Sequence, residues 1–534
     1  MDSQLTSAPA LLDPSIQTHL LYVNMARTGC QTCKIRRIKV SAVFLFPVST
    51  ADEALKCDGN EPICQRCAKS RRSCSRDCQI KPVRLSFHLE NDYASGITKR
   101  PRGPRPSASP SLLRPSLDIP SLAVTYFLYH YLDHFGIVST FSACMSECVT
   151  EWKAVNRISR MVDLAISAVA LGVFSHTQQQ ASAAREAVRS YRCLLGVVRE
   201  RITQAAVVRC DEGSFDEFLI TIVLMAWYET VMYQCVNVKN RDPMRSMHSW
   251  SHQDGALAIL KVWSEQRREC SPSSIVKQTR RGLIRSAIAR NYFLPDWVQD
   301  GSLFGENGLD LEFDAILVQV ANLKSTLKAL GPDESADPSL IEKLRHQARE
   351  LDNQCSRWAE VLPNQWSYES YRLPSSRTNS EFGTVFAHVC SRHTYAAVWV
   401  QLFAVRLLLN NVCLYLLKRT CTPLDSRNAE CHRCREKCQI QLQTLTHDLM
   451  CIVPSSLGRV KKMSIKAIDE ITLVSGDIPP SLALPVVWPL SIVSRLNGIE
   501  SGQQVWLRAL LANLGRVLGD GALECAGSDL WTHS

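Results

Sequence analysis

The chain has 534 residues, of which 46% are hydrophobic and 21% are charged, and its formal net charge is +10 at pH 7. This length exceeds one ordinary hydrophobic core, so we expect a small module together with one large or two medium domains. The 22 cysteines do not indicate a secreted disulfide scaffold, because residues 1–24 contain Asp2 and Asp13 and lack the basic start and apolar run of a secretory signal.

The positive charge is concentrated near the N-terminus. Residues 25–106 contain 17 Lys or Arg and 7 Asp or Glu, a difference of +10 that equals the net charge of the whole chain. A basic block that holds all the excess charge indicates a polyanionic partner, and DNA rather than a membrane is expected next to a metal site. We expect residues 1–24, which precede this block, to form a disordered arm.

Six cysteines of the basic block have the spacing of metal ligands. Two C-x2-C pairs each place two thiolates where one turn of backbone can bring them to a single ion, and thiolate-rich sites of this kind select zinc. Six thiolates give two zinc ions four ligands each only if two sulfurs bridge. The spacing therefore predicts one two-metal cluster rather than two separate fingers. Its predicted ligands are Cys30, Cys33, Cys57, Cys64, Cys67 and Cys74.

The residues around these cysteines carry a family resemblance. The runs 28–39 (TGCQTCKIRRIK) and 57–67 (CDGNEPICQRC) resemble the fungal Zn₂Cys₆ transcription factors, including the turn proline Pro62. The resemblance implies a binuclear zinc DNA-binding domain over residues 25–78, with two structural Zn²⁺ ions bridged by Cys30 and Cys64.

The resemblance also implies how this domain contacts double-stranded DNA. A short basic helix after the second cysteine enters the major groove, and Arg36 and Arg37 are expected to contact the guanines of a CGG-like site. The remaining basic residues are expected to contact DNA mainly through phosphates. They are Lys34, Lys39, Arg66, Lys69 and Arg71.

The third cysteine departs from the family pattern, because residues 40–56 (VSAVFLFPVSTADEALK) stand between the basic helix and Cys57. One interpretation is a tolerated loop, since each doubling of loop length costs only ~0.6 kcal/mol. We favour a retained intron, because Val40–Ser41 can be encoded by a splice-donor-like sequence and Lys56 by a codon that ends in AG. If the segment is translated, its apolar run next to the DNA-reading helix is expected to impair folding or DNA affinity.

Residues 79–116 are predicted to be a basic, Pro/Ser-rich, disordered linker, because alternating prolines prevent a packed helix. Its stretch 99–106 (KRPRGPRP) suits a nuclear import signal or an extra phosphate contact, although a merely solvated linker is the alternative. No heptad repeat follows Cys74, so the sequence leaves a homodimer open but without a coiled coil.

Residues 117–534 are predicted to form a large all-α domain, which makes the chain mainly α. Helical periodicity or apolar character marks residues 164–171, 181–201 and 215–233, and strand signals are few. The apolar run 396–417 is interrupted by polar and charged residues, which favours a buried or amphipathic helix over a membrane span.

This region carries a second, less specific resemblance. An Ala-rich helix, Tyr191, Tyr228–Glu229, and the motifs 250–256 (WSHQDGA), 294–297 (LPDW) and 487–490 (VWPL) occur in the order found in the fungal-specific transcription factor regulatory domain. The resemblance implies a helical regulatory domain that responds to a metabolite or a partner.

His252 lies two residues before Asp254, which suggests either acid–base chemistry or helix packing, and we favour packing. The sequence has no Walker-type glycine loop, GxSxG elbow or HExxH motif, so an enzyme is not expected.

We therefore expect a nuclear, zinc-dependent, sequence-specific DNA-binding regulator of RNA polymerase II transcription, acting on metabolic or secondary-metabolite genes. Its expected partners are double-stranded DNA and the transcription machinery, and no membrane. Two alternatives are a regulator whose DNA binding is defective because of residues 40–56, and a metabolite-binding helical protein.

Overall fold

A computed structural model describes residues 64–71, 118–132, 148–149, 159–205, 212–233, 249–266, 271–331, 337–373, 383–420, 429–465, 468–529 and 531. The chain divides into two compact units, residues 1–112 and 113–534. Of the described residues, 78% are helical. This confirms the prediction that the chain is mainly α. In the first unit the described residues form one short helix, α3 (Gln65–Lys69), with its flanking turns.

The second unit consists mostly of long helices. They are α5 (Ile119–Phe127), α7 (Arg160–Thr177), α8 (Ala181–Ala205), α9 (Glu212–Val231), α11 (Ser249–Gln266), α12 (Ser274–Arg290), α14 (Gly308–Ala329), α15 (Pro338–Glu360), α16 (His393–Thr420), α17 (Ala429–Ser456), α18 (Pro480–Val493) and α19 (Ser501–Leu518). Short helical segments join them, namely the π-helix η3 (Leu128–Leu132), α13 (Asp296–Gln299), the 3₁₀ turns η5 (Gly301–Phe304), η6 (Asn364–Trp366) and η7 (Cys525–Gly527), and α20 (Gly521–Glu524). The three helices predicted from the sequence are therefore present as α7, α8 and α9.

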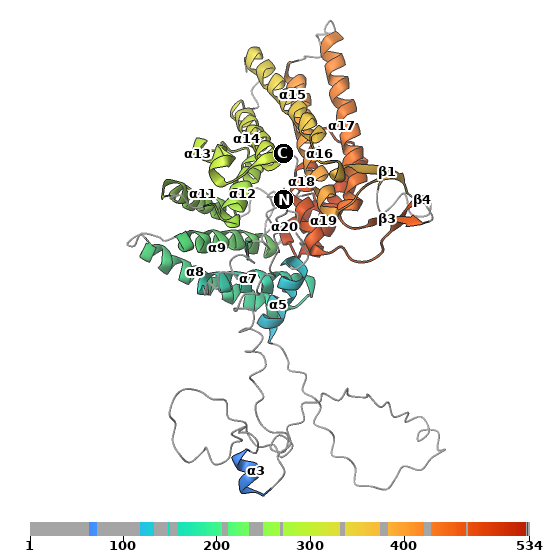
Figure 1. The fold of residues 1–534 in the computed structure, drawn as a ribbon. Coiled ribbons are helices and arrows are strands. Elements are labelled where there is room, and N and C mark those ends of the chain that lie inside the picture. The colour runs from blue at the N-terminus through green and yellow to red at the C-terminus, as the bar shows by residue number, and fades with distance from the viewer. Residues whose placement is uncertain are drawn as a thin grey trace, which may run out of the picture. The chain divides into compact units, whose positions relative to one another are not determined.

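Helices that follow one another in the sequence pack side by side (Figure 1). α7 contacts α5, α8 and α9, and the chain of contacts continues from α9 through α11, α12, α14, α15 and α16 to α17. α18 packs on α16, and α19 and α20 return to contact α7 and α9. Because the C-terminal helices return in this way, the first and last helices of the unit share one hydrophobic core.

α16 is the central apolar helix of this core. Among the described residues it is the one helix long and apolar enough to cross a membrane by length and composition, yet 83% of its most apolar window is buried inside the protein. It packs against α15, α17 and α18. Burial by neighbouring helices accounts for its composition, as expected for a core helix of this length.

A side-chain cap and two left-handed backbone conformations mark where three of the helices begin or end. The Ser159 hydroxyl accepts a hydrogen bond from the Val162 N–H at 3.2 Å and so caps α7, a contact worth about 1 kcal/mol. α12 ends at Asn291, which adopts the left-handed conformation with φ 54°. α19 ends at Gly519, with φ 61°, where an added Cβ would lie 3.0 Å from the Val173 carbonyl oxygen.

The all-α prediction for residues 117–534 is wrong in one detail, because two antiparallel hairpins occur there. β1 (Tyr368–Arg372) pairs with β2 (Phe386–Cys390), and β3 (Val460–Ile465) pairs with β4 (Ile468–Leu473). A satellite core joins the hairpins through Leu373, Ala387, Val389 and Val460. Strands this short carry little sequence signal, and they are stabilised by packing on each other and on α17.

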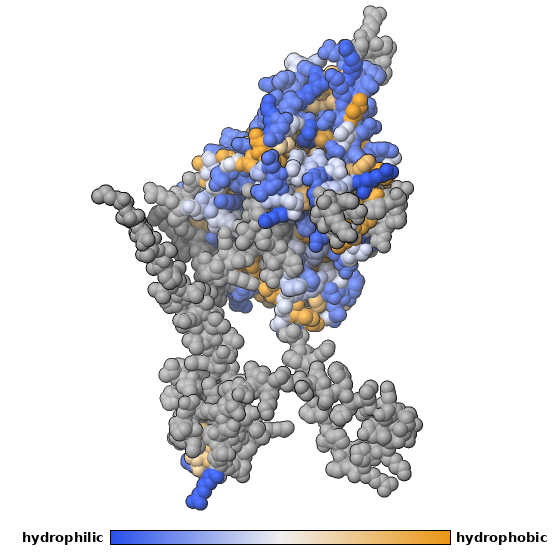
Figure 2. Space-filling view, turned by 45° about the vertical axis from the view of Figure 1, so that its right-hand side comes forward, coloured by the Kyte–Doolittle hydropathy of each residue, from blue (hydrophilic) through white to orange (hydrophobic). Residues whose placement is uncertain are grey.

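Figure 2 shows one face of the molecule, in which the coloured surface is largely hydrophilic with scattered hydrophobic patches. Exposed large hydrophobic residues among the described ones are distributed over several helices, for example Ile202 on α8 and Val505 on α19. Single exposed apolar residues of this kind are ordinary on soluble domains.

Candidate functional site

Two of the six predicted zinc ligands lie on one short helix. Cys64 immediately precedes α3 and Cys67 lies within it, and both side chains are buried. The Cys67 N–H donates a hydrogen bond to the Cys64 Sγ at 3.3 Å, so the two cysteines are held together within one turn. Two thiols presented by one turn of backbone fit half of a tetrahedral zinc site.

Three of the predicted DNA-contacting residues lie in or next to α3, and the structure describes the side chains of two of them. Lys69 ends α3 and Arg71 follows it in a left-handed conformation with φ 47°, and both side chains are exposed. Arg66 lies within α3, but its side chain is outside the described part of the chain. An exposed Lys69 and Arg71 next to buried cysteines are compatible with the predicted phosphate contacts.

The other predicted site residues lie outside the described residues, as do the insert 40–56 and the linker 79–116. They are Cys30, Cys33, Lys34, Arg36, Arg37, Lys39, Cys57 and Cys74. In the described ranges there is no group of three or more His, Cys, Asp or Glu side chains that could hold a metal ion.

A cluster in the helical unit joins residues that the sequence motifs keep far apart. The Tyr191 hydroxyl on α8 donates to Glu229 Oε1 at 2.7 Å and lies 3.2 Å from His252 Nε2 on α11. Tyr191 also stacks on Tyr228, with ring centroids 4.0 Å apart. Burial raises the pKa of Tyr228 to about 12, and burial together with the bond to Glu229 raises the pKa of Tyr191. Both phenols therefore stay protonated at neutral pH.

His252 and Asp254 do not act on a common partner. Asp254 accepts a hydrogen bond from Arg290 Nη1 at 2.7 Å, at the surface between α11 and α12, whereas His252 faces the tyrosine cluster. These contacts are those of helix packing, as the sequence analysis favoured. The cluster of Tyr191, Glu229 and His252 ties α8, α9 and α11 together.

Sequence reasoning missed a buried charge network between α12 and α14. Arg281 lies 2.5 Å from Glu306 Oε2 and 2.8 Å from Asp310 Oδ2. Arg280 is fully buried and donates to Asp314 and to the Val298 carbonyl, which holds α13 against α12. The sequence signal was the group of basic residues on α12 and the acidic residues before and within α14, but only the packing of the two helices pairs them.

Burial changes the protonation behaviour of this network. Asp310 Oδ1 accepts no hydrogen bond from a described residue, and burial raises the Asp310 pKa to about 6 despite the neighbouring Arg281. Burial disfavours the charged form of Arg285 in the same way. Together with the nearby Arg281 cation, it lowers the pKa of Arg285 to about 10. Charges this deep are stabilised only by their partners, so removing one partner is expected to be costly.

One cavity of about 400 Å³ lies among α9, α11, α12, α16, α18 and α19, and we call it the tryptophan cavity. Trp227, Trp250 and Trp488 line it together with Arg285, whose guanidinium lies 5.6 Å from the Trp488 ring centroid. Asp520 also lines it, where it caps α20 by accepting the Ala522 and Leu523 N–H groups. The two charged residues that line this cavity, Arg285 and Asp520, thus already make contacts within the protein.

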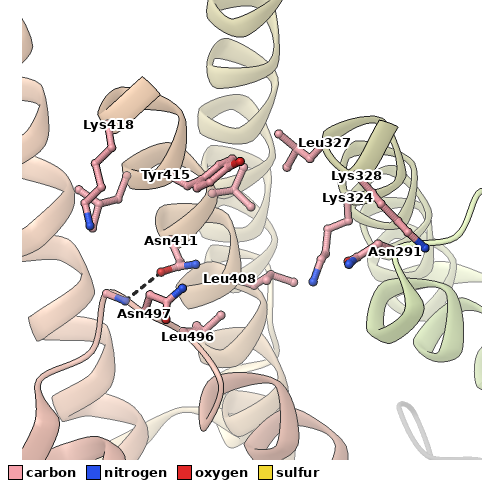
Figure 3. Close-up of a pocket in the computed structure, with 13 residues that line it drawn as sticks. Asn291, Lys324, Leu327, Lys328, Leu408, Asn411, Tyr415, Lys418, Leu496 and Asn497 are labelled. Atoms are coloured by element: carbon pink, nitrogen blue, oxygen red, sulfur yellow. Dashed lines mark hydrogen bonds between the residues drawn. The ribbon is translucent and has the colours of Figure 1, made fainter. Parts of the chain in front are cut away.

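A second cavity of about 320 Å³ lies between α14, α16 and the segment after α18, and we call it the lysine pocket (Figure 3). Three lysines and three asparagines contribute polar groups, and of the described residues that line the pocket none is acidic. Its lining residues are Asn291, Lys324, Leu327, Lys328, Leu408, Asn411, Val412, Leu414, Tyr415, Lys418, Leu496, Asn497 and Gly498.

No protein-family model matches this sequence, and neither a curated protein nor a solved structure is significantly similar to it. The cysteine motif therefore carries the functional argument for the first unit, and the geometry described above carries it for the second.

Proposed function

We propose that this chain is a zinc-dependent, sequence-specific DNA-binding regulator of RNA polymerase II transcription that acts in the nucleus, on metabolic or secondary-metabolite genes. The observation that carries the proposal is the set of six cysteines with two C-x2-C pairs, followed by the basic run that contains Arg36 and Arg37. The burial of Cys64 and Cys67 beside an exposed Lys69 supports it.

In this proposal the zinc ions are structural. Cys30 and Cys64 bridge the two ions, and the other four cysteines complete two tetrahedral sites. Zinc supplies a rigid cross-link between two short helices that have too little apolar surface to fold alone, so metal binding provides the folding free energy. Arg36 and Arg37 then read guanine edges, and the surrounding lysines and arginines bind phosphates.

The segment 40–56 favours a second candidate function, a regulator that no longer binds DNA. Its apolar residues Val43–Phe46 would lie next to the basic run that reads the bases. Such a protein would act through protein contacts alone. Sequencing the transcript across codons 39–57 shows whether the segment is removed by splicing.

The test compares the full-length protein with a variant that lacks residues 40–56. Native mass spectrometry should find two zinc ions per chain in the shortened form, and fluorescence anisotropy should show tighter binding to a CGG-containing duplex than to a scrambled duplex. A shortened protein without bound zinc contradicts the proposal. If only the shortened form binds zinc and prefers the CGG duplex, residues 40–56 are the cause of the impaired DNA binding of the full-length protein.

A further inference from the structure

Lys324 is the least expected residue of the lysine pocket. It lies on α14, is half-buried, and makes no hydrogen bond or ion pair with a described residue. An ammonium group withdrawn from water without a partner is costly, and a fold that needed only apolar filling would use Leu or Met there. Figure 3 shows its ammonium extending from α14 toward Leu408 of α16.

The surroundings of Lys324 add positive charge instead of neutralising it. Lys328 on α14 and Lys418 on α16 lie at the exposed rim, and the cation of Arg495, which follows α18, also acts on Lys324. Lys328 is only weakly engaged, since its Nζ lies 3.4 Å from the Arg290 carbonyl oxygen. Among the described residues, the charged groups near Lys324 on α14, α16 and the segment after α18 are therefore cations.

The uncharged polar groups of the pocket can orient a ligand. Asn291 Oδ1 is buried and accepts no hydrogen bond from a described residue, so its amide can turn either its oxygen or its nitrogen toward a ligand. Asn411 Oδ1, by contrast, accepts the Gly498 N–H at 3.0 Å, which holds the wall of the pocket in place. Leu327, Leu408 and Leu496 form the apolar part.

We propose that the lysine pocket binds a small organic carboxylate, with its charge against Lys324 and its hydrocarbon part against the leucines. A cavity of about 320 Å³ is at the lower end of the range used for small-molecule sites. An anion would supply a partner that Lys324 lacks among the described residues, and the described lining of the pocket contains no carboxylate that would compete with it. This inference is independent of DNA binding, because it concerns the helical unit alone.

Burial and the neighbouring Arg495 cation lower the pKa of Lys324 to about 8. A bound carboxylate favours the charged ammonium and so raises this pKa again. At about pH 8 roughly half of the Lys324 side chains are neutral before binding, so binding should take up about half a proton per ligand. Carboxylate affinity should weaken as the pH rises through this region.

The test is isothermal titration calorimetry of the full-length protein at pH 7 with 4-phenylbutyrate, and with its neutral counterpart 4-phenylbutyramide. We expect the carboxylate to bind at least about tenfold more tightly than the amide. The variant Lys324→Met should lose this preference, and Lys343→Met, at an exposed position of α15, should keep it. Lys418→Met at the rim should lower carboxylate affinity only about twofold to threefold.

Folding of Lys324→Met is checked by thermal unfolding, and we expect its melting temperature to stay equal or rise, because a half-buried ammonium group without a described partner is removed. If this variant does not fold, proton uptake by the wild-type protein, from titrations at pH 8 in buffers of different ionisation enthalpy, decides instead. Equal affinities for the two probes, no saturable binding of 4-phenylbutyrate, or binding without proton uptake would each overturn the proposal. None of these results bears on zinc or DNA binding, which native mass spectrometry and fluorescence anisotropy measure separately.

Discussion

Tyr191 shows how a single side chain can join helices that are distant in the sequence. Its ring stacks on Tyr228, and its hydroxyl donates to Glu229 and lies against His252. The hydroxyl of Tyr191 thus makes polar contacts to two other helices, α9 and α11. Arg37 is a second single residue of interest, and its proposed role rests on the sequence motif.

Replacing Tyr191 with Phe keeps the ring stack but removes the hydroxyl that donates to the half-buried Glu229 carboxylate. We expect Tyr191→Phe to lower the free energy of unfolding by about 1–3 kcal/mol. Urea denaturation followed by circular dichroism measures the change. The matched control is Tyr292→Phe, at an exposed tyrosine, which should change stability by less than about 0.5 kcal/mol. Similar losses in both variants would argue against a special role for the Tyr191 hydroxyl.

Arg37→Ala tests base reading in the protein without residues 40–56. The variant should reduce discrimination between CGG and scrambled DNA by roughly 1–3 kcal/mol, because a bidentate contact to guanine is lost. Lys69→Ala is the control, since loss of a phosphate contact should weaken binding to both duplexes alike. Anisotropy titrations at one fixed salt concentration measure both. A uniform loss for Arg37→Ala would show that Arg37 does not read bases.

At the scale of elements, close backbone contacts and buried ion pairs hold the helices in register. α20 approaches the end of α9 so closely that an added Cβ at Gly521 would lie 2.1 Å from the Tyr233 carbonyl oxygen. Between α12 and α14, the contact is instead made by charged groups around Arg281. Each kind of contact predicts a different response to substitution.

Gly521→Ala should destabilise the helical unit, because the added methyl group meets backbone rather than a flexible side chain. We expect a loss of about 1–3 kcal/mol in the free energy of unfolding. Gly196→Ala is the matched control, since no atom lies within 4 Å of a Cβ added there in the middle of α8. That substitution should stabilise by roughly 0.5–1 kcal/mol, because Ala favours helix. Thermal unfolding measures the stability of both variants. Equal changes in Gly521→Ala and Gly196→Ala would contradict the close packing of α20 against the end of α9.

The pH dependence of stability tests the network between α12 and α14. The Asp310 pKa is raised to about 6, above the usual value for an unfolded chain, so the native state binds this proton more readily. The associated stability is present at low pH and is lost as the pH rises through about 6.

Relative to Asp310→Asn, the wild-type protein should therefore gain roughly 1–2 kcal/mol of stability between about pH 7.5 and pH 5. Urea denaturation at each pH measures this difference. Asp254→Asn, at a surface pair with Arg290, serves as the control for general effects of pH. A difference that stays constant, or that grows toward high pH, would contradict the raised pKa of Asp310.

At the scale of the whole molecule, the two units are expected to depend on different forces. The described helices of residues 113–534 share a hydrophobic core, and the described residues contain no metal-binding cluster. In the protein without residues 40–56, zinc chelation should therefore abolish CGG binding while circular dichroism at 222 nm changes by less than about a tenth. Added zinc should restore DNA binding. Cooperative loss of the helical signal on chelation would show that metal also supports the large unit.

The sequence alone carried the zinc and DNA predictions, because ligand spacing and a basic run are local patterns that do not depend on distant contacts. It also indicated the mainly helical character and the helices α7, α8 and α9, since apolar periodicity is local as well. The resemblance to a regulatory domain named Tyr191, Glu229 and His252 without indicating that they meet.

Only the tertiary structure decided which of these residues touch. Three features depend on how helices distant in the sequence pack. They are the pairing of Arg281 with Asp310, the two hairpins, and the position of Lys324 in a cavity whose described lining has no acidic residue. A lysine on an amphipathic helix is usually solvated, and no local pattern separates it from one that a neighbouring helix covers. Burial and pairing are properties of the packed core, so they follow from the fold and not from spacing along the chain.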